Sequence, residues 1–339
     1  MSMKRLGLAL SVALVLAFTA AAALGQAEPS TAPAAQPAVE QNSAGKTASD
    51  QPAKAEDSTP KLDLTPDAGG NLTQEQMQAL FRVVADKDLE NDKRQRDYTY
   101  TERDEEHKVD GKGNVKSTES ETFDVMEING TQVRRKVAKN DQPLSPKDAA
   151  KEEERIQKDL AKRRNESDKD RKKREEEEAK DREEGRKWVR EIADAYNFRL
   201  VGSEEIDGRD NWVIQGEPRP GFHATLKYAK YLSSFHGRVW VDKTDLQLAK
   251  MDVECLNTVS WGLFIARIHK GSRFMMEQTR VNDEVWLPKH EAIKIDVRVA
   301  LLKNVNFDGD NTYRDYKKFR TTTKILGYGE VKQTEVQQP

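Results

Sequence analysis

Residues 147–191 are the most highly charged stretch of the chain and constrain its fold more than any other segment. Of these 45 residues, 17 are basic and 16 are acidic, and none is a proline. Opposite charges recur four residues apart, as in Glu154 and Lys158, and each such pair stabilises a helix by about 0.2–0.5 kcal/mol. Apolar residues are nearly absent over 160–188, so a helix there has no apolar face to bury. The sequence predicts a long, solvated charged helix, interrupted around 165–168.

Charges of both signs alternate within this run, so it presents no surface of a single sign. The whole chain carries a net charge of −2, whereas binding to nucleic acid depends on a clear basic excess. We therefore expect no nucleic-acid partner. Two interpretations of the run stay open: a solvated helix that binds nothing, or an arm that docks on another envelope protein.

The N-terminus carries the pattern of a secretory signal peptide. Lys4 and Arg5 precede an almost wholly apolar stretch, 6–24, and small residues lie before the end of segment 1–25. This pattern predicts export, with cleavage near Gly25 and a periplasmic mature protein. The alternative is an uncleaved N-terminal anchor, because a stretch of about 19 apolar residues can just span a bilayer.

Composition divides the rest of the chain into a linker, a folded domain and a tail. Residues 26–70 are rich in Ala and Pro and contain no aromatic residue, which predicts a disordered linker. Residues 332–339 are expected to form a flexible tail. Residues 71–331 are expected to form one domain, interrupted by the charged helical insertion at 147–191.

Within that domain the pattern predicts helices and many antiparallel strands. Thr73 and Gln76 form a capping box that opens an amphipathic helix over 74–92. Asp-Gly or Asn-Gly pairs mark tight hairpin turns, as at 207–208, and Glu291–Leu301 alternates apolar and polar residues, as a half-buried strand does. The fold class is α+β, with about ten or eleven strands. An antiparallel sheet of that size is expected to curl or close.

Three further segments carry predictions that depend on pattern alone. Residues 224–235 have apolar residues at helical spacing, and 306–311 are rich in Asn, Asp and Gly, which indicates a hairpin turn. Residues 261–268 form a strand that is apolar on both faces. Such a strand is either packed on both sides or lines an apolar cavity with one face.

The second interpretation of the 261–268 strand predicts a ligand cavity. Methionine on the next strand suits a wall that adapts to flexible chains, and a tryptophan follows beyond it. The candidate wall residues are Trp240, Trp261, Leu263, Ile265, Met276 and Trp286.

No pattern in the sequence predicts a catalytic or metal site. The five histidines show none of the spacings typical of zinc ligands, and no glycine-rich phosphate loop or nucleophile elbow occurs. Cys255, the only cysteine, alternates with apolar residues on a strand and is expected to be a buried, inert thiol. We expect no metal, no cofactor and no enzymatic activity.

Several short motifs carry a resemblance to a known family. They are Glu204–Ile214 with its Asp-Gly turn, Pro218–Gly221, Gly237–Asp242, Lys270–Ser272 and Val285–Pro288. A strand-turn-strand, a short helix, then "G-x-V-W-V-D" and "W-L-P" resembles the outer-membrane-lipoprotein-sorting, LolA/LolB-like superfamily of bacterial periplasmic proteins. The resemblance covers about 71–146 and 192–331.

The resemblance implies an incomplete, half-open antiparallel barrel that is covered by helices and takes up acyl chains. It leads us to expect an exported periplasmic protein that binds a lipid or the acyl chain of a lipoprotein. The charged run at 147–191 is not part of the family pattern. The alternative is therefore a non-enzymatic envelope interaction or lipid-sensing regulatory protein that acts through that helix.

Overall fold

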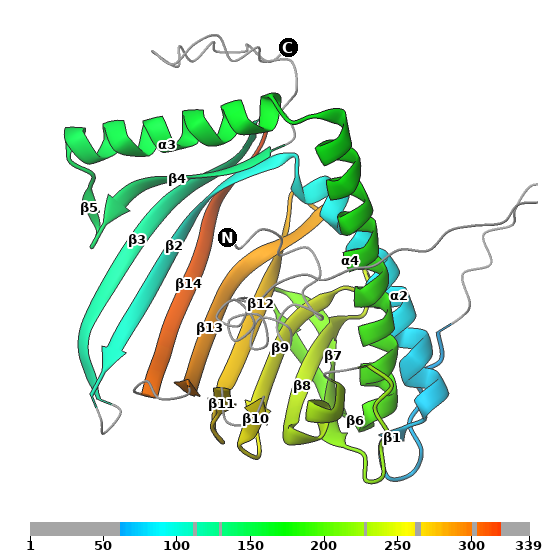
Figure 1. The fold of residues 1–339 in the computed structure, drawn as a ribbon. Helices are drawn as coiled ribbons and strands as arrows, with labels where there is room; N and C mark the ends of the chain where they lie inside the picture. The colour runs from blue at the N-terminus through cyan, green and yellow to red at the C-terminus, as the bar shows by residue number, and fades with distance from the viewer. Residues whose placement is uncertain are drawn as a thin grey trace, which may run out of the picture.

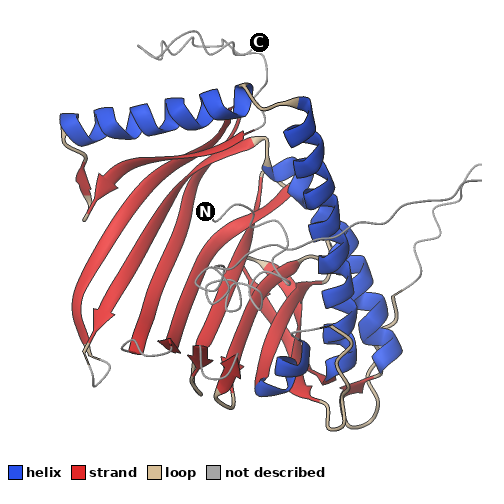
Figure 2. Cartoon of the chain, viewed as in Figure 1, coloured by secondary structure: helices blue, strands red, loops and turns tan. Residues whose placement is uncertain are grey.

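The computed structural model describes residues 62–110, 114–128, 131–226, 229–261, 266–299 and 304–319 (Figures 1 and 2). The predicted signal peptide, most of the predicted linker and the predicted tail lie outside these residues, as do Leu263 and Ile265. The described residues form three α-helices, one short 3-10 helix and 14 strands.

All 14 strands belong to one sheet, and all their pairings are antiparallel. Their order is β1-β6-β7-β8-β9-β12-β13-β14-β2-β3-β4-β5, with β10 and β11 attached beside β13. The strands are β1 (Asn71–Leu72), β2 (Tyr98–Val109), β3 (Val115–Ile128), β4 (Thr131–Lys139), β5 (Gln142–Pro143), β6 (Tyr196–Ile206), β7 (Arg209–Pro218), β8 (Phe235–Asp242), β9 (Leu248–Cys255), β10 (Val259–Trp261), β11 (Ala266–Ile268), β12 (Arg273–Val281), β13 (Val285–Val299) and β14 (Asn304–Lys318).

The α+β class and the large antiparallel sheet are confirmed. The sheet is open within the described residues, because no pairing joins its end strands β1 and β5. The expected strand number was too low, since β1, β5, β10 and β11 have only two or three residues each. Strands that short carry no readable alternation in the sequence.

Local sequence signals start the three α-helices where expected. Helix α2 (Gln74–Gln95) begins at the Thr73 capping box. Helices α3 (Pro146–Arg164) and α4 (Asp168–Ala195) are capped by Ser145 and Ser167, each accepting a hydrogen bond from a first-turn backbone N–H. The two charged helices are separated at 165–167, within the predicted interruption.

Helices α2 and α4 pack on one face of the sheet, over the half that runs from β6 to β13, and we call this face of the whole sheet the helix face (Figure 2). Met77 and Leu80 of α2 and Ala193 of α4 form one buried cluster with Ile214 and Met276 from the sheet. Helix α3 runs from β5 toward α4 and lies along β4 (Figure 1). The charged helices are therefore tied to the sheet at both ends, with the C-terminal end of α4 packed in the core.

The folded part begins earlier than residue 71, the predicted boundary. Leu64 is buried, and Leu62 packs against the same cluster as α2. Asp67 accepts backbone hydrogen bonds from Gly69 and Asn71, forming a turn that leads into β1. These two leucines are the bulky apolar residues at the end of the predicted linker, and burying them offsets the cost of ordering it.

The prediction of one strand over 261–268 is wrong. Strands β10 and β11 pair antiparallel, with Trp261 opposite Ala266 and Val259 opposite Ile268, so the chain reverses between them. This pairing buries Val259 and Ile268 in one cluster with Phe235 and Cys255. A single extended strand would separate the two residues.

Two other local predictions are also wrong. Residues 224–235 do not form an α-helix; the 3-10 helix η1 covers only Ala229–Ser234, and Glu191 of α4 holds Thr225 by its backbone N–H and hydroxyl. Residues 306–311 do not turn. They lie inside β14, where pairing with both β13 and β2 satisfies the backbone along an extended strand.

Candidate functional site

The helix face changes from apolar to charged along the sheet. Cross-strand neighbours share a face in an antiparallel sheet, so the register gives a continuous line of side chains. It begins with Ile214, Val239, Met251 and Met276 on β7, β8, β9 and β12. It continues with Glu291, Asn311, Asp104 and Glu121 on β13, β14, β2 and β3.

The charged half contains a group of side chains that we call the acidic cluster: Glu102, Asp104, Arg134, Glu291 and Tyr313. Arg134 donates from Nε to Glu102 Oε2 at 2.8 Å and from Nη2 to Asp104 Oδ2 at 2.7 Å. The Tyr313 hydroxyl donates to Glu291 Oε2 at 3.0 Å. Glu291 is 5% exposed and Glu102 is 9% exposed, so two of the three carboxyl groups are largely buried. The guanidinium of Arg134 pairs with Glu102 and Asp104.

Burial shifts the pKa values of this cluster. It raises the pKa of Glu102 to about 7, because the attraction of Arg134 offsets the desolvation only in part and Asp104 adds repulsion. Burial also raises the pKa of Glu291, against the lowering effect of hydrogen bonds from the side chains of Tyr313 and Asn311. Both carboxyl groups therefore hold a proton at a higher pH than exposed glutamates do.

Two carboxyl oxygens of the cluster are buried without a hydrogen-bond partner among the described residues. They are Glu291 Oε1 and Asp104 Oδ1. A buried acceptor without a partner costs about 1–3 kcal/mol. Asp104 and Arg134 have side chains about one-third exposed, at 34% and 33%, so solvent reaches the cluster from the β2–β4 side.

Partly buried apolar side chains lie next to the acidic cluster on the helix face. Val253, Phe274 and Ile293 are neighbours across β9, β12 and β13, and all three are partly buried. We call these three residues the apolar row. Ile293 follows Glu291 on the same face of β13, and Phe307 beyond it is 41% exposed. The face therefore places an incompletely covered apolar strip beside buried carboxylates.

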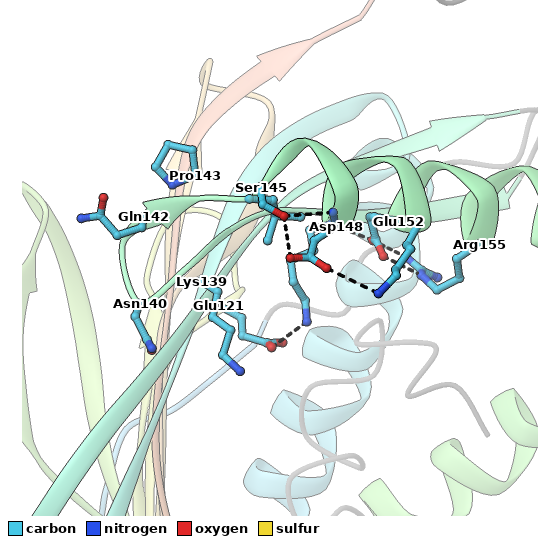
Figure 3. Close-up of a pocket in the computed structure, with 12 residues that line it drawn as sticks. Glu121, Lys139, Asn140, Gln142, Pro143, Ser145, Asp148, Glu152 and Arg155 are labelled. Carbon is cyan, nitrogen blue, oxygen red and sulfur yellow. Dashed lines mark hydrogen bonds and ion pairs between the residues drawn. The ribbon is translucent and has the colours of Figure 1, made fainter.

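A polar pocket of about 710 Å³ lies at the other end of the charged half, between α3 and strands β3 to β5 (Figure 3). Its charged side chains pair with one another. Lys136 contacts Glu121 at 2.6 Å, and Arg155 contacts Glu152 at 2.7 Å, which holds the pKa of Glu152 below its usual value. Ser145 at the α3 N-terminus bonds Asp148. Most of these charges are thus matched within the pocket.

The predicted wall residues are divided between separate clusters. Trp240 and Trp286 lie together with Val213 and Ala249, whereas Met276 lies under α2 and α4 in the main cluster. Trp261 lies at the end of β10, opposite Ala266. Leu263 and Ile265 lie outside the described residues. A cavity wall formed by these six residues stays a prediction.

Sequence reasoning did not identify the acidic cluster. Its members come from β2, β4, β13 and β14, and about 190 residues separate Glu102 from Glu291. Strand β2 is so rich in charged residues that nothing marks Glu102 as buried. One weak signal is its alternation with Tyr100, since both lie on the helix face and the Tyr100 and Tyr313 rings are 6.0 Å apart.

The expected burial of Cys255 is confirmed, and burial raises the pKa of its thiol. Among the described residues, no three His, Cys, Asp or Glu side chains are grouped closely enough to hold a metal ion. None of the described helices combines the length and apolar character needed to cross a membrane.

Comparison with known proteins finds similarity in solved structures alone. No family model and no curated protein matches the sequence. A structure described as an outer membrane lipoprotein-sorting protein domain, from Vibrio parahaemolyticus, is 12% identical with a TM-score of 0.30, covering 72% of this chain and 95% of that one. A LolA superfamily protein from Nitrosomonas europaea is 10% identical with a TM-score of 0.24, covering 74% and 97%. A DUF1329 family protein from Desulfovibrio piger is 11% identical with a TM-score of 0.27, covering 73% and 95%. The names of the Vibrio and Nitrosomonas proteins are those of the superfamily that the sequence motifs resemble.

Proposed function

We propose that this protein is an exported, non-enzymatic periplasmic protein that binds a lipid, or the acyl chain of a lipoprotein, on its helix face. The observation that carries the proposal is the polarity of that face: the apolar row adjoins the acidic cluster directly. A lipid has the same two parts, an acyl chain and a polar headgroup. The basic and apolar pattern of 1–25 supports export.

The apolar row borders the buried core of this face, and its own side chains are only partly buried. Val253 and Phe274 pack against the cluster under α2 and α4 without being fully covered. Each acyl methylene that such a surface removes from water contributes about 0.8 kcal/mol. A chain of ten carbons that is fully removed from water therefore contributes about 8 kcal/mol, from which the cost of immobilising the lipid is subtracted.

Native mass spectrometry of protein purified from the periplasm tests the proposal. We expect a lipid-sized mass to accompany the folded protein, and we expect the purified protein to take up a fluorescent fatty acid. Absence of both a bound lipid and fatty-acid uptake would overturn the proposal.

One observation favours a second candidate, an envelope interaction through the charged helices. Helix α4 exposes oppositely charged side chains along its first half, with Lys172 near Glu176 at 3.9 Å and Lys173 near Glu177 at 3.9 Å. Exposed pairs of this kind add little stability, so they are available to a partner. A photo-crosslinking residue at position 172, compared with one at exposed position 210 on the β7 side, tests this. Capture of one defined protein from position 172 alone supports the docking role, and capture from neither position contradicts it.

A further inference from the structure

The acidic cluster has an excess of acceptors that its own residues do not satisfy. The cluster has three carboxyl groups and one guanidinium, which pairs with Glu102 and Asp104. Among the described residues, Glu291 Oε1 and Asp104 Oδ1 have no hydrogen-bond partner. Glu291 is 95% buried, as its exposed fraction is 5%. A positively charged hydrogen-bond donor would supply both a hydrogen bond to these oxygens and a counter-charge for the carboxylates.

We propose that this cluster binds the primary ammonium group of a lipid headgroup, with the acyl chain of the same molecule on the apolar row. The proposal rests on the function proposed above and names the headgroup class. Ile293 and Glu291 occupy successive positions on the helix face of β13, about 7 Å apart. A headgroup at Glu291 thus begins where the apolar row ends.

The chemistry of the cluster favours an ammonium group over a metal ion. The described residues contain no group of three carboxylate, His or Cys side chains that could coordinate a metal. An alkylammonium has three N–H donors on a flexible chain, so it does not require converging ligands. The rings of Tyr100 and Tyr313, 6.0 Å apart in the same region, add a surface that attracts cations.

The unpaired oxygens further favour a primary amine over a quaternary one. A trimethylammonium group carries the same charge but has no N–H to donate, so it would leave Glu291 Oε1 and Asp104 Oδ1 without hydrogen bonds. The basic side chains Arg134 and Lys136 lie beyond the carboxylates, on β4, and both stand over the Phe123 ring at 4.0 and 5.7 Å. A phosphate next to the amine would therefore meet positive charge on that side.

Calorimetric titration with probes that share a twelve-carbon chain tests the proposal. Dodecylamine, dodecyltrimethylammonium and dodecanol are titrated into the purified protein at pH 8, the two cations below their micelle concentrations and dodecanol below its solubility limit. We expect dodecylamine to bind about tenfold more tightly than either of the others, the size expected of a charge-assisted hydrogen bond. In Glu291→Gln, the ratio of amine to alcohol affinity should fall to near one.

Glu105→Gln is the matched control. Glu105 is on the same strand as Asp104 but on the opposite face, where it pairs with Arg103 at 2.5 Å, so the variant should keep the wild-type affinity ratio. Equal affinity of the wild type for dodecylamine and dodecanol would overturn the ammonium site and leave lipid binding standing. Equal affinity for the primary and the trimethylated amine would also overturn it. Failure of all three probes to bind would overturn the proposed function itself.

A second pair of probes identifies the source of the amine. Lauroyl lysophosphatidylethanolamine and lauroyl lysophosphatidylglycerol share a chain and a phosphate, and only the first has an ammonium group. We expect the first to bind about tenfold more tightly to the wild type. If the two bind equally while dodecylamine keeps its preference, a lipid headgroup is excluded as the source of the amine.

Discussion

The side chain of Asn91 on α2 makes a pair of hydrogen bonds to the backbone of Trp286 on β13. Its Nδ2 donates to the Trp286 carbonyl at 2.7 Å, and its Oδ1 accepts from the Trp286 N–H at 2.7 Å. Strand β14 pairs with β13 only from His290 onward, so Asn91 occupies the edge that β14 leaves open. One amide thereby fixes α2 to the sheet and satisfies two backbone groups.

Removing this amide should destabilise the protein chiefly through the Trp286 N–H that it leaves unpaired, because Gln95 Nε2 also donates to the Trp286 carbonyl at 3.0 Å. We expect Asn91→Ala to lower the free energy of unfolding by about 1–3 kcal/mol, because Asn91 is 4% exposed and buried unpaired groups are costly. Urea unfolding followed by circular dichroism measures the change. Lys93→Ala, at an exposed position on the same helix, is the control. Equal stability of the two variants would contradict a bridging role.

The buried carboxyl groups should make the protein less stable as the pH rises from about 5 to 7. The pKa of Glu102 is raised to about 7, mainly by burial, and that of Asp88 on α2 is also raised to about 7 by burial. An acid whose pKa is higher when folded binds its proton more tightly in the folded state. The stability it contributes is present at low pH and is lost as the pH passes through the folded pKa.

Urea unfolding at several pH values between 5 and 8 measures this loss. We expect the free energy of unfolding to decrease over that interval in the wild type, and to decrease less in Glu102→Gln, which cannot ionise. A wild-type slope that is flat, or that matches the slope of the variant, would show that Glu102 ionises normally in the folded protein.

Lipid binding should depend on which face of β12 carries a polar substitution. Phe274 belongs to the apolar row, whereas Met275 beside it lies on the opposite face, and both are partly buried. We expect Phe274→Gln to weaken binding of a fluorescent fatty acid at least tenfold, since it removes roughly 2 kcal/mol of apolar contact. Met275→Gln should bind within twofold of the wild type. Equal loss in both variants would mean that the substitutions act through folding.

Helix α3 should be held to the sheet by one apolar side chain among its charges. Ile156 is 2% exposed, and Arg155 beside it donates to the Arg134 carbonyl on β4 at 2.7 Å. We expect Ile156→Ala to cost about 2–4 kcal/mol and to increase hydrogen exchange across α3. Gln157→Ala, at an exposed position, should change neither. If Ile156→Ala changed neither the stability nor the hydrogen exchange of α3, this helix would not be packed on β4.

Local features of the fold were accessible from sequence because they depend on neighbouring residues. Thr73 and Gln76 mark the start of α2, and an Asp-Gly pair marks the β6–β7 turn, where Asp207 has φ of 50° and Gly208 has φ of 76°. The predictions that failed, at 224–235, 261–268 and 306–311, concern segments whose conformation depends on distant partners. Contact with Glu191 sets the conformation of the first segment, and strand pairing sets the conformation of the other two.

The candidate site is the part that sequence reasoning missed, because it is a product of strand order. Strand β14 lies between β13 and β2, which places Tyr313 opposite Glu102 and Asn311 opposite Glu291. In the sequence alone, nothing distinguishes each of these residues from other polar residues of a strand. Their burial, their shifted pKa values and the unpaired oxygens arise from that pairing.

By itself, then, the sequence determined the helix starts, the charged helices, most strands and the α+β class, since hydrogen bonding and apolar periodicity act over a few residues. Tertiary structure alone decided that α3 and α4 are tied to the sheet, and that an apolar row adjoins an acidic cluster. Those features follow from pairings between residues about 200 positions apart, as between Glu102 and Tyr313. Side-chain packing over the whole sheet selects such pairings, and no local pattern encodes them.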